Sequence, residues 1–169
     1  LIQDTCGDRF DAMFGPAYKG IPLVTTTAGA LATTYGIDKP YFFNRKEAKD
    51  HGEGGFMVGY QPQAGDVIAI VGDVVTAGTA VRESIALFQK VAPVKISSLF
   101  VSVDRMERGQ GSCSTLDELR KEYGIAVHPI VTVRDIIQFL YERPIDGKVY
   151  IDHAMKERME AYLRQYGAE

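Results

Sequence analysis

Several residue types that define specialised protein classes are scarce or missing. The 169 residues include no tryptophan, only two cysteines and only three histidines. Cys6 and Cys113 lie far apart and in no CxxC or Cys/His spacing, so the sequence supports neither a disulfide framework nor a zinc site. Reduced thiols of this kind fit a cytoplasmic enzyme. A run of about 18 apolar residues is also missing, so we expect no membrane-spanning helix.

Neither sign of charge dominates the chain. The net charge of -3 leaves no basic surface at the level of the whole chain. This argues against a duplex-DNA-binding protein, although a small anionic ligand needs only a local basic cluster. Hydrophobic residues at 46%, charged residues at 24% and 17 glycines are typical of a globular protein, and not of collagen, a disulfide miniprotein or a disordered chain.

Short apolar runs alternate with helical periodicity along the chain. We expect strands over 10–14, 41–44, 66–71, 96–103 and 125–131, and helices over 20–35, 81–88, 116–123, 133–141 and 151–166. The run 66–71 is apolar on both faces, as a central parallel strand covered by helices must be, and we expect it to end at Gly72-Asp73. This alternation predicts one α/β domain over residues 1–169, with a mostly parallel central sheet flanked by helices.

One connection is unusually long. About twenty residues separate the strands at 41–44 and 66–71, whereas most loops in such units have about 2 to 6. The segment carries Arg45, Lys46, Lys49 and His51 among glycines that permit large backbone excursions. Its composition is compatible with a solvated flexible loop and with a lid that grasps an anion.

The strongest local signal is a strand, a turn and a helix over 67–88. The strand end carries Asp73, and the chain turns through Thr76-Ala-Gly-Thr-Ala80 into the helix. Unpaired N–H groups at a helix start can hold a phosphate, Gly78 permits close approach, and Thr76 and Thr79 add hydroxyl donors. The spacing is neither GxxxxGK[ST] nor GxGxxG. A purely structural turn with a threonine cap is the alternative.

A second turn of this kind spans Gly15 to Gly20, with Lys19 at the entrance to the next helix. Taken alone, this lysine could equally be a solvated surface charge. Two anion sites at strand ends, together with a basic lid, indicate a ligand with more than one phosphate group.

Four segments resemble a known family. Gly72-Asp-Val-Val-Thr-Ala-Gly-Thr-Ala80 resembles the phosphoribosyl-pyrophosphate signature of type I phosphoribosyltransferases. Within that family, Arg45 to Gly55, Phe14 to Gly20 and Ser102 to Gly109 are similar to the bacterial orotate phosphoribosyltransferases. The resemblance covers about residues 10 to 145.

The resemblance implies a type I phosphoribosyltransferase fold with a flexible catalytic lid. It implies Mg²⁺-dependent transfer of the phosphoribosyl group from 5-phosphoribosyl 1-diphosphate to orotate, giving orotidine 5'-monophosphate and pyrophosphate in pyrimidine (UMP) biosynthesis. It also implies a homodimer with active sites shared between subunits, and no nucleic-acid or membrane partner. A phosphoribosyltransferase for another base and a non-catalytic, donor-sensing regulator of the same fold are the alternatives.

The resemblance assigns roles to individual residues. Lys49, His51 and Asp73 would act in catalysis, with Asp73 on the ribose hydroxyls. Lys46 would contact the diphosphate in its own subunit, while Arg45, Lys49 and His51 would reach into the site of the partner subunit. No side chain is assigned as a direct metal ligand, because Mg²⁺ is expected mainly through the donor and water. The remaining donor-binding residues would be Tyr18, Lys19, Val74, Val75, Thr76, Ala77, Gly78, Thr79 and Ala80, and orotate would meet Thr76 and Arg105.

Two departures from the family pattern affect this assignment. The family has a pair of acidic residues at the central strand end, and the first of the pair is Gly72 here. Relatives also carry an N-terminal segment with a lysine and an aromatic pair that bind orotate. We expect this chain to lack its natural N-terminal segment, and the alternative is that part of the pyrimidine pocket is absent. His128 and His153 match no family motif, and we expect both to be structural.

Overall fold

The computed structural model describes residues 1–45, 57–75, 78–111 and 113–168. Its centre is a six-stranded sheet with the order β3-β2-β1-β4-β5-β6, in which all neighbours are parallel except the antiparallel pair β2–β3. The strands are β1 (Ala12–Gly15), β2 (Tyr41–Asn44), β3 (Met57–Gly59), β4 (Val67–Val75), β5 (Lys95–Asp104) and β6 (Ala126–Thr132). The helices are α1 (Ile2–Thr5), α2 (Gly20–Tyr35), α3 (Thr79–Val91), α4 (Thr115–Tyr123), α5 (Val133–Leu140) and α6 (His153–Tyr166), and β7 (Pro144–Ile145) pairs with β8 (Lys148–Val149). The expected α/β architecture with a mostly parallel sheet is confirmed.

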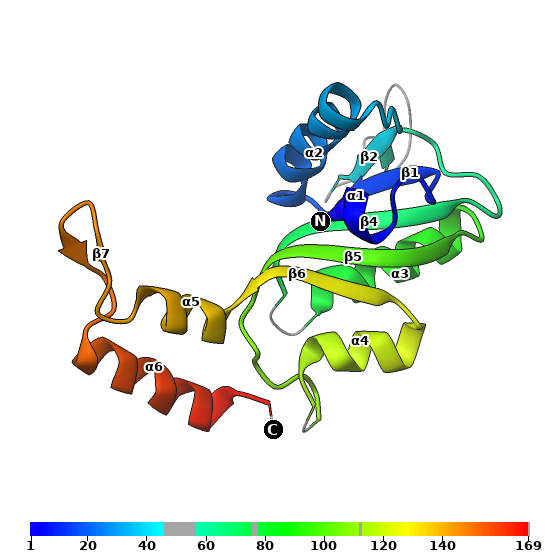
Figure 1. Ribbon diagram of the computed structural model, residues 1–169. Helices are drawn as coiled ribbons and strands as arrows, with labels where there is room; N and C mark the ends of the chain where they lie inside the picture. Colours follow the sequence, from blue (N-terminus) through cyan, green and yellow to red (C-terminus); the bar gives the residue numbers. More distant parts are fainter. Residues whose placement is uncertain (46–56, 76–77, 112, 169) are drawn as a thin grey trace.

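The hydrophobic core has one part on each face of the sheet, because successive side chains of a strand point to opposite faces. Ile68 and Ile70 of β4 pack with α3 and α4, whereas Ala69 and Val71 pack with α1 and α2. Since successive side chains of a strand point to opposite faces, a strand buried on both sides must be apolar throughout. Figure 1 shows α2 on one side of the sheet and α3 and α4 on the other.

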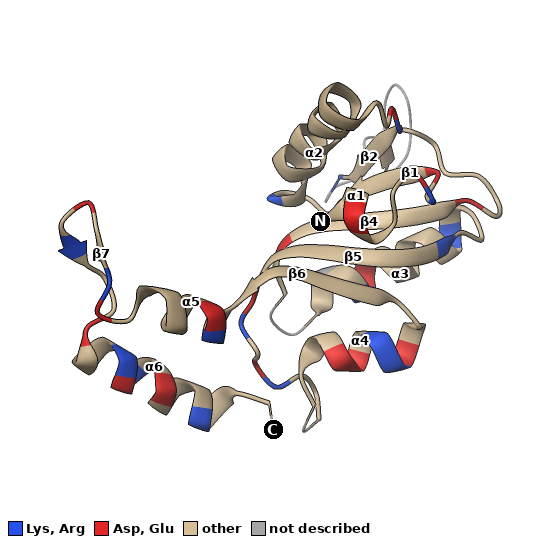
Figure 2. Ribbon diagram, in the orientation of Figure 1, with Lys and Arg blue, Asp and Glu red and all other residues tan. Residues whose placement is uncertain are grey.

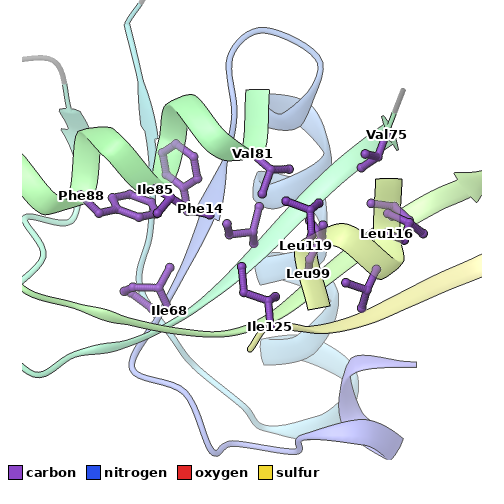
Figure 3. Close-up of a cluster of buried hydrophobic side chains, with 14 of the residues drawn as sticks. Phe14, Ile68, Val75, Val81, Ile85, Phe88, Leu99, Leu116, Leu119 and Ile125 are labelled. Atoms are coloured by element: carbon purple, nitrogen blue, oxygen red, sulfur yellow. The ribbon is translucent and has the colours of Figure 1, made fainter. Parts of the chain in front are cut away.

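The larger of the two clusters lies between the sheet and helices α3 and α4. Figure 3 shows its side chains converging from these helices and from β1, β4 and β5. Phe14 is fully buried, with its ring centroid 5.0 Å from that of Phe42 and 4.9 Å from that of Phe88. Truncating a buried ring of this kind costs about 3–5 kcal/mol. The cluster therefore holds β1 and β4 rigidly against α3.

The C-terminal elements extend away from the sheet. In Figure 1, α5 leaves the end of β6, the β7–β8 hairpin forms the far tip, and α6 runs back beside α5. The end of α6 meets the loop after β5, because the Arg108 N–H donates to the Tyr166 carbonyl (2.9 Å) and the Ala168 N–H donates to the Met106 carbonyl (2.9 Å). None of the described helices combines the length and apolar character that crossing a bilayer requires.

Most predicted elements are present, with some changed bounds. Strand β4 continues past Gly72-Asp73 to Val75, because β5 offers pairing partners as far as Asp104. Strand β1 begins at Ala12, since Phe10 lies in a turn where its N–H donates to the Asp8 carbonyl (2.8 Å). Helix α1, strand β3 and the β7–β8 hairpin were not predicted from the sequence.

Candidate active site

A cleft of about 540 Å³ opens at the carboxyl edge of the parallel strands. The loop after β1, the end of β4, the start of α3 and Arg105 after β5 all line it. In open α/β sheets, ligands bind in this position, because the loops that leave neighbouring strands converge there. The described part of the long connection after β2 contributes nothing to the lining.

Close backbone packing shapes the loop after β1. A Cβ on Gly15 would lie 2.3 Å from the Gly20 carbonyl oxygen, so only glycine allows the strand end to approach the start of α2 so closely. The Ala17 N–H donates to Oδ1 of Asn44, at the end of β2 (2.9 Å). These contacts fix a short loop that presents Tyr18 and Lys19 to the cleft, both with exposed side chains.

An ion pair crosses the cleft between two predicted site residues. Nζ of Lys19 lies 3.2 Å from Oδ2 of Asp73, and the two side chains are 83% and 35% exposed. Screening by water makes such an exposed pair weak, at most about 1 kcal/mol. A ligand that offers an anion to the lysine and hydroxyls to the carboxylate can therefore replace it readily.

The start of α3 supplies a second anion-binding element. Gly78 caps the helix with φ 72°, in the left-handed region, and a Cβ there would lie 2.9 Å from Cγ2 of Thr115. Both constraints require glycine at this position. The first N–H groups of a helix have no partner within the helix and lie at the positive end of its dipole, so they favour a phosphate.

Arg105 lines the cleft from the loop after β5. Its Nη2 lies 2.5 Å from Oε1 of Glu107 and donates to the Tyr162 hydroxyl (3.1 Å), and that hydroxyl donates to Glu107 (2.7 Å). The hydrogen bond to Glu107 raises the pKa of the Tyr162 hydroxyl, which therefore stays protonated as a donor. Both contacts of Arg105 use Nη2, and the guanidinium carries further N–H donors in a planar fork suited to a carboxylate.

The structure brings together most of the predicted site residues that it describes. Tyr18, Lys19, Asp73, Val74, Val75, Gly78, Thr79 and Arg105 all line the one cleft. Val75 is buried in the core and is therefore suited to contact a ligand only through its backbone. Ala80 lies in the first turn of α3, and Arg45 follows β2 without lining the cleft. Lys46, Lys49, His51, Thr76 and Ala77 lie outside the described residues.

Sequence reasoning did not identify the residues that hold Arg105 in place. Glu107 is a neighbour in the chain, but Tyr162 lies 57 residues away on α6. No local pattern links two positions at such a separation. A tyrosine among the charged residues of the terminal helix was the signal that the sequence offered.

Neither remaining histidine lies in the cleft. His128 of β6 stacks on Phe100, with ring centroids 5.1 Å apart, and burial lowers the pKa of its imidazole. His153 begins α6 and lies 3.4 Å from Glu157. Within the described ranges, no three Cys, His, Asp or Glu side chains converge as a metal cage.

Comparisons with known proteins identify the family. No family model matches the chain. It is 46% identical over 168 residues to an orotate phosphoribosyltransferase from Clostridium acetobutylicum, covering 99% of this chain and 75% of the relative. It is 48% identical over 162 residues to one from Yersinia enterocolitica, covering 96% of this chain and 72% of the relative.

Solved structures agree with the sequence comparisons. The crystal structure of orotate phosphoribosyltransferase from Francisella tularensis superposes with a TM-score of 0.77 at 30% identity, covering 99% of this chain and 75% of that one. A UMP synthase from Leishmania donovani shares the fold, with a TM-score of 0.68 at 20% identity, covering 93% of this chain and 30% of that one. The fold is thus that of the type I phosphoribosyltransferases, and the chain belongs to the orotate phosphoribosyltransferase family of enzymes.

Proposed function

We propose that this enzyme transfers the phosphoribosyl group from 5-phosphoribosyl 1-diphosphate to N1 of orotate, giving orotidine 5'-monophosphate and pyrophosphate for pyrimidine biosynthesis. One observation carries the proposal. A single cleft joins a helix start suited to a phosphate, a carboxylate suited to ribose hydroxyls, a lysine suited to a diphosphate and an arginine suited to an anionic pyrimidine. Orotate phosphoribosyltransferases that share 43% to 48% of the aligned residues support the choice of orotate over another base.

Each part of the donor has a matching group in the cleft. The 5'-phosphate accepts hydrogen bonds from the start of α3 at Gly78 and Thr79, together with Thr76, Ala77 and Ala80 of the signature. The ribose hydroxyls meet Asp73, and the diphosphate meets Tyr18 and Lys19. Donor binding then replaces the Lys19–Asp73 ion pair with two charge-assisted contacts.

The proposed reaction requires electrostatic stabilisation of the charges that develop in the transition state, and it requires no covalent nucleophile. As the bond from the anomeric carbon to pyrophosphate breaks, positive charge develops on the sugar and negative charge on the leaving group. Lys19 is placed to stabilise the departing diphosphate, with Lys46 of the same subunit and Arg45, Lys49 and His51 of the partner subunit. Arg105 orients orotate through its carboxylate, and exclusion of water prevents hydrolysis of the donor.

The donor set of the cleft fits magnesium. Mg²⁺ keeps several waters and is bound through one or two carboxylates plus substrate phosphates. Asp73 is the acidic residue among those that line the cleft, so it would hold a hydrated ion beside the diphosphate. The ion, when bound, neutralises charge on the diphosphate. We assign the reaction to the cytoplasm, in keeping with the free thiols of Cys6 and Cys113.

Turnover with orotate tests the proposal directly. The purified protein should consume orotate in an absorbance assay coupled to decarboxylation of the product, and only when donor and Mg²⁺ are both present. Adenine and uracil serve as control acceptors. Turnover of another base in place of orotate would assign the enzyme to a different acceptor, and donor binding without any turnover would indicate a regulator.

Gly72 offers a test of the donor site. A Cβ on Gly72 would meet no atom closer than 3.9 Å, so the strand has room for the first atom of a side chain, and Gly72 lines the cleft into which the rest can extend. We expect Gly72→Asp to lower the KM for the donor, because a second carboxylate can accept from the ribose hydroxyls or a metal-bound water. The gain should be about 1–2 kcal/mol, near the lower end for a hydrogen bond to a charged group.

Gly72→Asn is the matched control for Gly72→Asp, because it adds a side chain of similar size without the charge. Thermal unfolding of both variants should resemble that of the parent. An unchanged or higher KM for the donor in Gly72→Asp would show that the local backbone is adapted to glycine.

A further inference from the structure

A carboxylate on α4 binds the backbone of the loop that carries Arg105. Oε1 of Glu118 accepts from the Gly111 N–H (2.7 Å), and Oε2 accepts from the Gln110 N–H (3.1 Å). These two hydrogen bonds lower the pKa of the Glu118 carboxyl. A Cβ on Gly109 would lie 2.2 Å from Oε2, so glycine there is what lets the carboxylate approach. The contact is thus shaped by three consecutive loop residues, 109 to 111.

The same carboxylate reaches the helix that begins at the phosphate-binding turn. Nη2 of Arg82 lies 3.3 Å from Oε2 of Glu118, and the two side chains are only 19% and 16% exposed. Arg82 lies in the first turn of α3, where its backbone N–H donates to the Gly78 carbonyl (2.9 Å). Arg82 is also paired with Glu122, one turn further along α4. The Glu118 carboxylate therefore contacts the helix that begins at the phosphate-binding turn, through Arg82. It also contacts the loop after β5, through the backbone N–H groups of Gln110 and Gly111.

The two segments joined in this way carry proposed contacts to the two substrates. Gly78 and Thr79 line the cleft at the proposed 5'-phosphate position, and Arg105 lines it at the proposed orotate position. Glu118 is not among the lining residues. Figure 2 shows charged residues of both signs along α4 and along the loop after β5. The connection thus runs outside the cleft, on the side of α4.

We propose that Glu118 is a positioning residue that couples the donor-phosphate turn to the acceptor loop, so that filling the phosphate site orders Arg105 for orotate. The assignment of the two loops rests on the proposed function. Ordering one loop with a ligand reduces the conformational entropy that the second ligand must still remove, and this produces positive coupling between the sites. Coupling of this kind is reciprocal and changes affinity by about 5- to 150-fold in typical cases.

Equilibrium binding measures the coupling without turnover. Ribose 5-phosphate fills the phosphate and ribose positions but has no leaving group, so orotate affinity can be measured by calorimetry with and without it. In the parent, saturating ribose 5-phosphate should tighten orotate binding by at least about fivefold. In Glu118→Gln this ratio should fall towards one, because the amide keeps a single acceptor oxygen and cannot accept from both backbone N–H groups and pair with Arg82.

Two further variants separate coupling from general destabilisation. Glu122→Gln removes a carboxylate from the same helix and from the same arginine, but the amides of Gln110 and Gly111 donate to Glu118 and not to Glu122, so the parent ratio should remain. Gly109→Ala keeps every charge and displaces the Glu118 carboxylate with a methyl group, so it should reproduce the loss. A ratio near one in the parent, a parent-like ratio in Glu118→Gln, or equal losses in Glu118→Gln and Glu122→Gln would overturn the inference.

Hydrogen exchange keeps this test independent of the proposed reaction. Ribose 5-phosphate alone should slow exchange of the Gln110 and Gly111 amides in the parent and not in Glu118→Gln. If the parent fails to convert orotate but shows this protection, the proposed acceptor is wrong and the coupling holds. If the parent converts orotate but shows neither protection nor coupling, the proposed function holds and the role of Glu118 is wrong.

Discussion

Lys49→Ala is expected to lower kcat by roughly 10² to 10³, the range for losing one preorganised donor that acts in the transition state. The reason is that charge grows on pyrophosphate as it departs, and the proposed role of Lys49 is to meet that charge. The KM for the donor should change less, because most of the proposed donor contacts come from other residues. Steady-state kinetics with orotate and varied donor measure both parameters.

Lys95→Ala is the matched control for Lys49→Ala. Lys95 begins β5 at the amino edge of the sheet, opposite the cleft, and its side chain is exposed. Its loss should leave kcat and KM close to those of the parent. An unaltered kcat in Lys49→Ala would remove Lys49 from the mechanism and favour the reading of residues 45 to 55 as a solvated loop.

The sequence predicted the central architecture because its signals are local. Helix α2 has the expected bounds, since Gly36 ends it with φ 67° in the left-handed region that glycine favours. Strand β2 also has its expected bounds, Tyr41–Asn44. The apolar run in β4 predicted a strand covered on both faces, and the two core clusters confirm this. Burial on both faces leaves no polar alternation, so the signal for such a strand is a short apolar run rich in β-branched residues that ends at a glycine.

The elements that were missed are short or depend on tertiary pairing. Strand β3 has three residues, too few for alternation to be visible, and its pairing with β2 defines it. The β7–β8 hairpin did have a local signal. Asp146 and Gly147 form its turn with φ values of 49° and 77°, and an Asp-Gly pair is typical of a two-residue hairpin turn.

In the cleft too, the local sequence predicts where the functional residues lie, whereas the contacts that orient them depend on tertiary packing. Lys19, Gly78 and Arg105 each follow a strand in sequence and Asp73 lies near the carboxyl end of β4, so their meeting at one sheet edge follows from the parallel topology. The contacts that fix their geometry do not follow from it. Tyr162 reaches Arg105 across 57 residues, and only the packing of α6 against the loop after β5 brings them together.

A mixture of two nearly inactive variants is expected to regain activity. The family resemblance implies that Lys49 of one subunit lies over the site of its partner and that Asp73 acts in its own subunit. In a hybrid dimer of Lys49→Ala and Asp73→Asn, one site therefore carries both lesions and the other carries none. In a two-fold dimer the same surfaces meet twice, so random exchange makes half of the dimers hybrid and leaves about a quarter of all sites intact.

The activity regained by the mixture distinguishes active sites that are shared between subunits from sites formed within one subunit. About a quarter of the parent activity would stand far above the roughly 1% or less expected of the Lys49→Ala dimer. Activity should appear with the kinetics of subunit exchange, and mass measurement of differently tagged variants identifies the hybrids. If confirmed hybrids stay as inactive as their components, Lys49 acts within its own subunit. The placement of Arg45, Lys49 and His51 across the interface would then be wrong. A hybrid dimer contains an intact site only if Lys49 comes from the subunit that does not supply Asp73 to that site.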